Sequence, residues 1–110
     1  MADTYKYVQG DTGPQIQVSI TDLDGTAVDL SGATVTLHFR AAGTTTVLFS
    51  RPLIITSGNA GLGVAVLQWA TSDLNVDAGN YEGELETVLA SGVRETRYEV
   101  LKFKVREDFA

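Results

Sequence analysis

Apolar and polar residues alternate along most of this chain, and that period of two most constrains its fold. In residues 16–20, Ile16, Val18 and Ile20 share one side of an extended segment, and residues 33–40 repeat the pattern. Successive side chains of a β-strand point to opposite faces. A helix would need apolar residues at i, i+3, i+4 and i+7, which no segment sustains for three turns. The alternation therefore predicts an all-β protein.

Turn residues rich in Gly, Asp, Ser and Pro divide the chain into short segments. We expect strands in residues 5–8, 15–21, 33–40, 45–50, 53–56, 64–69, 81–87 and 93–106. Two adjacent apolar residues near Val100 indicate a β-bulge or kink in the last strand. Roughly seven to nine short strands in this length are typical of an immunoglobulin-like antiparallel β-sandwich, with a barrel as the alternative.

The segment DAGNY at residues 77–81 predicts a structural corner made by Asp77, Gly79 and Tyr81. In sandwiches, a Tyr at the start of a late strand bonds its hydroxyl back to the backbone. We expect Gly79 to permit a close approach and Asp77 to bond turn amides. The alternative is an ordinary loop before a strand.

Length and composition set the broad class of protein. The 110 residues predict one domain, residues 1–110, with residues 1–9 and 106–110 as arms that reach a neighbour. The absence of cysteine excludes disulfides, thiolate metal sites and cysteine catalysis. A net charge of −6 disfavours nucleic acid as a partner. The sequence has neither a signal-peptide pattern nor an apolar run of the roughly 20 residues that span a bilayer, so we expect no membrane partner.

No constellation of residues indicates catalysis or a cofactor. His38 is the single histidine, and alternation places it on the outer side of its strand. Asp22, Asp24 and Asp29 lie close in sequence, but their spacing does not match a calcium loop, and turn chemistry accounts for them. We therefore expect no enzyme activity, no metal, no cofactor and no small-molecule substrate.

Two rows of charge alternate outward on late strands. Glu82, Glu84 and Glu86 form an acidic row, and residues 102–106 carry a basic row. If these strands pair antiparallel, the rows lie on one face, where opposite charges stabilise the sheet by roughly 0.2–1 kcal/mol per pair. A solvated face of ion pairs is the simpler interpretation, and a charged docking surface is the alternative.

Four aromatic residues are candidates for contact with a partner. Trp69 is expected in the core, as in many sandwiches, or else as an anchor at an interface. Tyr5, Tyr7 and Phe109 lie in or near the two expected arms. Exposed aromatics, among them Tyr98, would instead favour a carbohydrate- or cell-surface-binding module.

The order of the turn motifs resembles a known family. The motifs are GDTGP at 10–14, DLDGT at 22–26, VDLSGA at 28–33 and DAGNY at 77–81, interleaved with strands 16–21, 61–69 and 93–105. Together they resemble tailed-phage virion proteins, above all the N-terminal immunoglobulin-like domain of phage baseplate upper proteins. The resemblance covers nearly the whole chain and depends on the order of the motifs.

That resemblance implies a non-enzymatic structural role in a virion assembled in the bacterial host cytoplasm. The implied partners are other virion proteins and copies of this chain. Larger family members continue with a helical linker and a platform for a receptor-binding protein, whereas this sequence stops at residues 107–110. We therefore expect a stand-alone tail or baseplate adaptor, an accessory component, a capsid-decorating protein or an excised domain.

Overall fold

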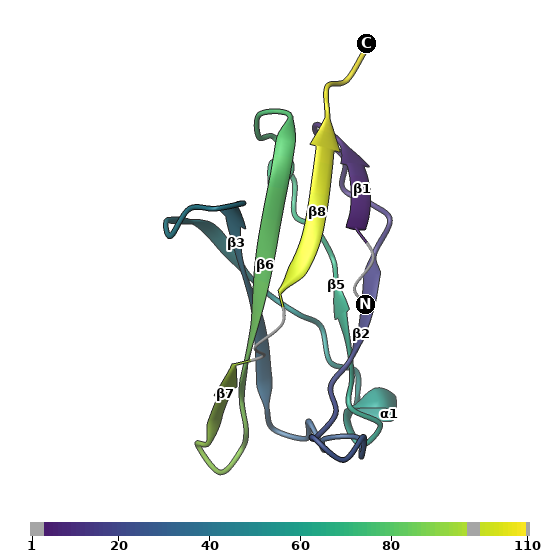
Figure 1. Ribbon diagram of the computed structural model, residues 1–110. Coiled ribbons are helices and arrows are strands. Elements are labelled where there is room, and N and C mark those ends of the chain that lie inside the picture. Colours follow the sequence, from purple (N-terminus) through teal and green to yellow (C-terminus); the bar gives the residue numbers. More distant parts are fainter. Residues whose placement is uncertain (1–3, 97–99, 110) are drawn as a thin grey trace.

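A computed structural model describes residues 4–96 and 100–109 as a sandwich of two β-sheets (Figure 1). The strands are β1 (Thr4–Val8), β2 (Ile16–Ser19), β3 (Thr34–Ala41), β4 (Val47–Pro52), β5 (Val64–Leu67), β6 (Gly79–Val88), β7 (Arg94–Thr96) and β8 (Leu101–Arg106). One helical turn, α1 (Ser57–Ala60), precedes β5. The prediction of an all-β chain with seven to nine short strands is confirmed.

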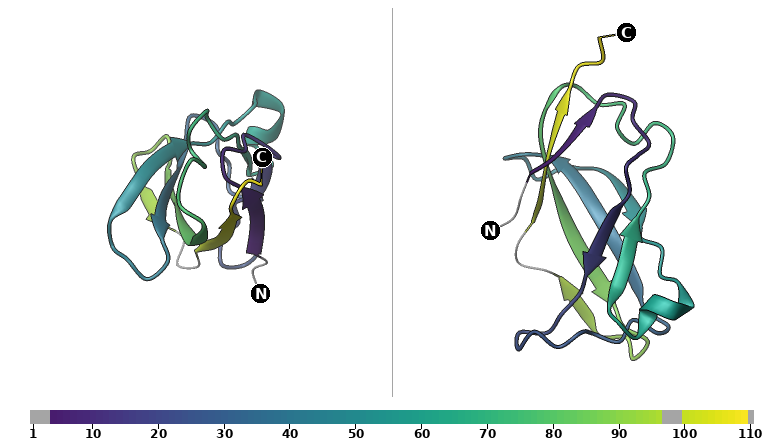
Figure 2. Two further views of the ribbon diagram at one scale, coloured as in Figure 1. Left: turned by 90° about the horizontal axis from the view of Figure 1, so that it is seen from above. Right: turned by 90° about the vertical axis from the view of Figure 1, so that its right-hand side faces the viewer.

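The two sheets differ in size and lie face to face (Figure 2). The larger has the order β1-β8-β6-β3-β4, with β7 beside the far end of β6, and the smaller pairs β2 with β5. In immunoglobulin terms, β3, β6 and β8 occupy the places of strands C, F and G, with β4 as an added C′ strand. The chain therefore folds as an immunoglobulin-like sandwich, as alternation and turn spacing predict.

The N-terminal strand corrects two expectations. Residues 4–8 form β1, which pairs parallel with β8 from Thr4↔Lys102 to Val8↔Arg106. They are therefore part of the sheet and not an arm, and the sandwich is not wholly antiparallel. Residues 4–8 lie in the sheet because the inward side of β1 packs into the core. Tyr7 is buried there, and its hydroxyl donates to the Pro14 carbonyl at 2.8 Å.

The expected last strand is two strands. β7 pairs with β6 through Glu86↔Thr96, and β8 pairs with it through Gly83↔Leu101. The register therefore shifts by two residues between them, in the stretch that includes Val100. The bulge or kink expected near Val100 adjoins residues 97–99, which lie outside the described part of the chain.

An aromatic cluster joins the two sheets. Phe39, at the middle of β3, is fully buried and stacks on Phe49 of β4 and Tyr81 of β6, with ring centroids 4.8 and 5.1 Å apart. Trp69, just after β5, meets Phe39 edge-on at 5.8 Å and Phe103 of β8 at 5.6 Å. Such pairs stabilise a fold by about 0.5–1.5 kcal/mol each beyond the area they bury.

Gly83 leaves room for this cluster at the centre of β6. A Cβ atom there would lie 2.5 Å from Cδ1 of Leu37 and 2.9 Å from Cε2 of Phe103. Both neighbours are buried, so neither side chain can move aside without disturbing the core. The absence of a side chain at this position is therefore a packing requirement.

We predict that Gly83→Ala destabilises the protein by about 1–3 kcal/mol, because overpacking forces shifts in a dense core. The measurement is the free energy of unfolding in urea. Gly58→Ala is the matched control, since Gly58 lies in α1 and a Cβ there meets no atom within 4 Å. The control should be neutral or slightly stabilising, and equal losses in both variants would contradict the packing argument.

Candidate functional site

The corner at residues 77–81 has the geometry of a tyrosine corner. The Tyr81 hydroxyl donates to the backbone carbonyl of Asp77 at 2.6 Å, and the Tyr81 ring is buried. Burial raises the pKa of this hydroxyl above its usual value, and the charge of Asp77 acts in the same direction. The raised pKa favours the protonated hydroxyl, which is the form that donates this hydrogen bond.

Two details of this corner differ from expectation. Asp77 contributes its carbonyl, and its carboxylate makes no hydrogen bond within the described residues. A Cβ at Gly79 would meet nothing within 4 Å, so Gly79 permits no close approach. The corner is therefore made by one side chain and one carbonyl, and its role is architectural.

The four aromatic candidates for partner contact separate into buried and exposed residues. Trp69 is 2% exposed and Tyr7 is 5% exposed, and Tyr5 is half-buried against Phe103. The core position expected for Trp69 agrees with its burial, and the alternative of an interface anchor does not. The expectation that Tyr7 contacts a partner is corrected, because its ring also fills the core. Phe109 is 89% exposed, and its ring lies 4.5 Å from the guanidinium carbon of Arg106. Among these four, Phe109 is the one most open to a partner.

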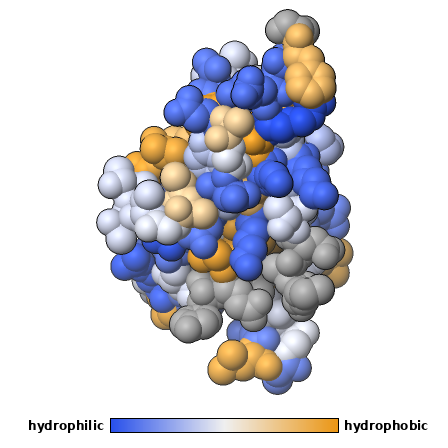
Figure 3. Space-filling view, turned by 45° about the horizontal axis from the view of Figure 1, so that its top comes forward, coloured by the Kyte–Doolittle hydropathy of each residue, from blue (hydrophilic) through white to orange (hydrophobic). Residues whose placement is uncertain are grey.

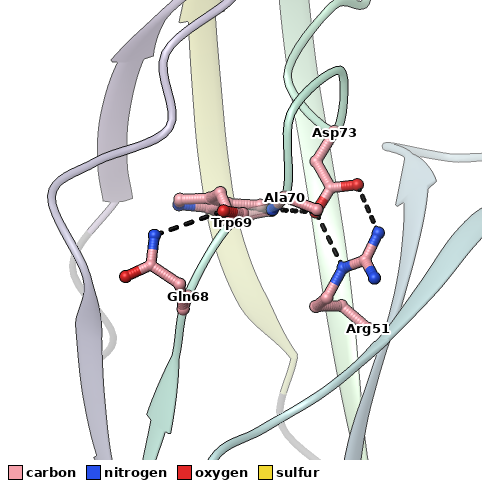
Figure 4. A network of polar contacts seen from close by, with 5 residues as sticks. All are labelled: Arg51, Gln68, Trp69, Ala70 and Asp73. Atoms are coloured by element: carbon pink, nitrogen blue, oxygen red, sulfur yellow. Dashed lines mark hydrogen bonds and ion pairs between the residues drawn. The ribbon is translucent and has the colours of Figure 1, made fainter.

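An ion pair that sequence reasoning missed secures the turn after Trp69 (Figure 4). The Arg51 guanidinium donates to both carboxylate oxygens of Asp73, at 2.9 and 2.6 Å. The same carboxylate accepts the Ala70 amide at 2.8 Å, and its side chain is 6% exposed. Asp73 therefore ties edge strand β4 to the loop that crosses between the sheets, which accounts for it without a metal.

The acidic row of β6 contacts side chains of β3 and β7 on the outer face of the larger sheet. Arg40 pairs with Glu82 at 3.1 Å, and Glu86 contacts both Arg94 and His38. His38 Nε2 donates to Glu86 at 3.0 Å, and its Nδ1 lies 2.7 Å from the Ser50 hydroxyl. His38 is thus held by hydrogen bonds with Glu86 and Ser50 on the outer side of its strand, the side that alternation predicts.

The rows also pair across strands. Glu82 lies opposite Lys102 in the antiparallel register of β6 and β8. The antiparallel pairing on which the solvated-face interpretation depends is therefore present. However, the lysines of β8 form no ion pair within the described residues, because Glu82 is held by Arg40 instead.

Within residues 4–96 and 100–109, no group of three or more His, Cys, Asp or Glu side chains could hold a metal ion. Two shallow hollows occur. One, of about 330 Å³, lies on β1 and β8 beside Lys6 and Lys104. The other, of about 370 Å³, lies at the opposite end beside Ser31 and Ser57.

Exposed apolar side chains offer the clearest route to a partner. Between Phe39↔Phe49 and Arg40↔Val47 the register shifts, so Leu48 is an extra residue in a β-bulge of β4. As a result, Val47 and Leu48 are 48% and 50% exposed side by side, on a strand whose alternation would otherwise hide one of them. The face in Figure 3 likewise carries separate hydrophobic patches among hydrophilic side chains.

No protein-family model matches this chain, and no curated protein is significantly similar to it. A search of the described helices for one long and apolar enough to cross a membrane finds none.

We predict that Tyr81→Phe lowers stability by about 0.5–1.5 kcal/mol, the usual net value of one hydrogen bond. Removing the hydroxyl leaves the ring in place and the Asp77 carbonyl without its donor. Thermal or urea unfolding measures the effect. Tyr5→Phe is the control, because the Tyr5 hydroxyl forms no hydrogen bond within the described residues. A loss as large in the control would argue against the corner.

We predict an acid-dependent loss of stability to which Glu86 contributes. The hydrogen bond from His38 lowers the pKa of Glu86 below its usual value, and Arg94 acts in the same direction. A carboxyl whose pKa is lower in the folded state stabilises the protein above its unfolded pKa, and this stability is lost as the pH falls. Glu86→Gln should therefore flatten the decline of the unfolding midpoint from about pH 5 downward.

The matched control is Glu84→Gln, on the same strand face but without a described ion pair or hydrogen bond. It should follow the parent protein over the same pH range. Asp24 and Asp29 also have lowered pKa values, from hydrogen bonds donated by Thr26 and Ser31 respectively. A residual acid dependence therefore remains in Glu86→Gln, and a slope identical to that of the parent protein would contradict the prediction.

Proposed function

We propose that this protein is a non-enzymatic structural component of a phage virion, a tail or baseplate adaptor or accessory protein that acts through protein–protein contacts. The observation that carries the proposal is the bulge in β4, which presents Val47 and Leu48 together at a sheet edge. Bulges at sheet edges re-aim side chains, and paired apolar side chains in solvent favour contact with another protein.

Several ionisable side chains are held by partners within the fold, and this supports the same structural role. His38, Arg40 and Glu86 are all used in ion pairs within the larger sheet. Arg51 and Asp73 are used to hold a loop. A binding component needs a rigid body with exposed anchors, and this chain has both. The order of its turn motifs, which resembles baseplate upper proteins, supplies the virion as the setting.

Capsid decoration is the nearest alternative, since it would use the same kind of surface at another position in the particle. Binding of carbohydrate is less well supported, because Trp69 and Tyr7 are buried and therefore form no platform on which a sugar could stack. Tyr98, also a candidate for that platform, lies outside the described residues.

The direct test is mass spectrometry and immunogold electron microscopy of particles purified by density gradient from the source of this chain. We expect the protein in the particle fraction, with label at one site such as the tail tip. Label spread over the head would instead support decoration. Recovery only in the soluble fraction, with none on particles, would reject the proposal.

We further predict that Val47→Asp with Leu48→Asp reduces incorporation into particles at least tenfold while leaving a folded domain. Charged side chains at an apolar contact lose binding because they are buried without partners. Thr45→Asp with Thr46→Asp is the matched control in the adjacent exposed loop, with the same change in net charge. Both proteins are first compared by thermal unfolding. Normal incorporation of the β4 variant would exclude this edge as the contact.

A further inference from the structure

Three of the eight Lys and Arg residues of this acidic chain line one hollow, and none of the three forms an ion pair within the described residues. The hollow on β1 and β8 is lined by Lys6, Tyr7, Val8, Lys104 and Arg106 and has a volume of about 330 Å³. Lys6 lies directly opposite Lys104 in the parallel register. Like charges directly opposite each other destabilise a sheet.

Charged side chains elsewhere on the outer face have partners, whereas the two lysines of the hollow do not. On β3 and β6, Arg40 has Glu82, and His38 has Glu86. Within residues 4–96 and 100–109, neither Lys6 nor Lys104 forms an ion pair. Arg106 donates to the Glu107 carbonyl and stacks on Phe109, so its charge is not neutralised. An anion from outside the fold would relieve the repulsion.

The opposite end of the molecule carries an acidic loop, whose charge is opposite to that of the hollow. The chain turns tightly at residues 22–26, where the Gly25 amide donates to the Asp22 carbonyl at 2.9 Å and the Asp22 amide donates to the Thr26 carbonyl at 2.8 Å. Leu23 at the tip is fully exposed, and Asp22 and Asp24 flank it. The Thr26 amide donates to the Asp24 carboxylate at 3.0 Å, which orders that side chain.

We propose that the acidic loop of one copy, residues 22–25, docks into the basic hollow of a second copy. Asp22 and Asp24 would then neutralise Lys6, Lys104 and Arg106. Leu23 would pack against Val8, which lines the hollow, and against Phe109, whose ring lies beside Arg106. This inference rests on the assembly role proposed above and names one partner for it.

The occupant is a second copy because this chain itself supplies the complementary charges together with an exposed apolar residue. A nucleic acid is disfavoured by the net charge of −6, which repels a long polyanion beyond the few cations of the hollow. A small inorganic anion would neutralise the cations, but it would not cover the apolar side chains beside them or give the exposed Leu23 a contact.

The geometry of the contact is head to tail. The loop at residues 22–26 and the ends of β1 and β8 at Val8 and Arg106, which line the hollow, lie towards opposite ends of a molecule 44 Å long (Figures 1 and 2). A contact between two different surfaces repeats from copy to copy, so it builds a ring if the rotation closes and a filament if it does not. One loop in a shallow hollow buries little area, so the isolated contact is weak and becomes effective in an array where many copies are held together.

The test is sedimentation velocity of the purified protein over a wide concentration range in low salt. We expect the weight-average mass to rise with concentration, and the rise to disappear near 1 M salt, where the Debye length is only about 3 Å. Lys6→Glu with Lys104→Glu should abolish association, and so should Asp22→Lys with Asp24→Lys. Circular dichroism and thermal unfolding check that each variant is folded.

Two further samples separate this contact from general charge effects. An equimolar mixture of the two variants should associate, although each alone does not. The unaltered acidic loop of one variant meets the unaltered basic hollow of the other, and the lysine loop of the second meets the glutamate-lined hollow of the first. The chain that carries all four changes has the parent net charge and a reversed contact, and it should associate like the parent protein.

Leu23→Ser should weaken association at least fivefold, whereas Leu62→Ser, another exposed leucine, should not.

Several outcomes would overturn the inference. A parent protein that stays monomeric at every concentration excludes the contact, even if an acidic peptide or single-stranded DNA binds the hollow. Association that survives the Lys6 and Lys104 reversals, or a four-change chain that is not rescued, excludes this pairing of surfaces. Because the experiment uses purified protein alone, its failure is distinct from absence of the chain from virus particles.

Discussion

The edge-on contact between Trp69 and Phe39 joins the two sheets, and the positions of the sheet edges depend on it. Trp69 follows β5 of the smaller sheet, whereas Phe39 lies on β3 of the larger one. Trp69 also meets Phe103 of β8 edge-on, so its ring packs against two strands of the larger sheet.

The outer surfaces of edge strands β4 and β1 depend on the rings that pack against Phe39 and Trp69. Phe49 stacks on Phe39 and holds the edge strand that carries Val47 and Leu48. Tyr7 meets Trp69 with ring centroids 5.4 Å apart and holds the strand that carries Lys6. The rings on the inner side of each edge strand therefore determine which apolar or charged side chains the outer side presents. Core and surface are two faces of the same strands.

Local patterns allowed much of the fold to be predicted. Alternation identifies β2, β3 and β6 because each strand buries one face, and the Tyr81 corner spans only four residues. Other features depend on distant pairing. Tyr7 is buried because β1 lies beside β8, almost a hundred residues later. The local pattern predicts a strand in residues 5–8, but it does not reveal the strand with which these residues pair.

The surface was harder to predict than the core. Arg51 meets Asp73 only because the chain crosses from β4 to the smaller sheet, where Ile54 bridges Val66. The bulge at Leu48 has no glycine to mark it, so the exposure of Val47 beside Leu48 emerges only from the register with β3. Similarly, Lys6 and Lys104 become neighbours through the parallel pair. Sequence patterns report periodicity within a strand, whereas surfaces depend on register between strands.

The parallel pairing of β1 with β8 also has a mechanical consequence. Thr4 lies beside Lys102 and Val8 beside Arg106, so the chain enters the pair at one end and leaves it at the other. Tension applied along the chain at these two points pulls the strands lengthwise past each other. The load then falls on all the hydrogen bonds of the pair together, whereas an antiparallel pair would open one bond at a time. A domain connected in this way resists stretching along its long axis.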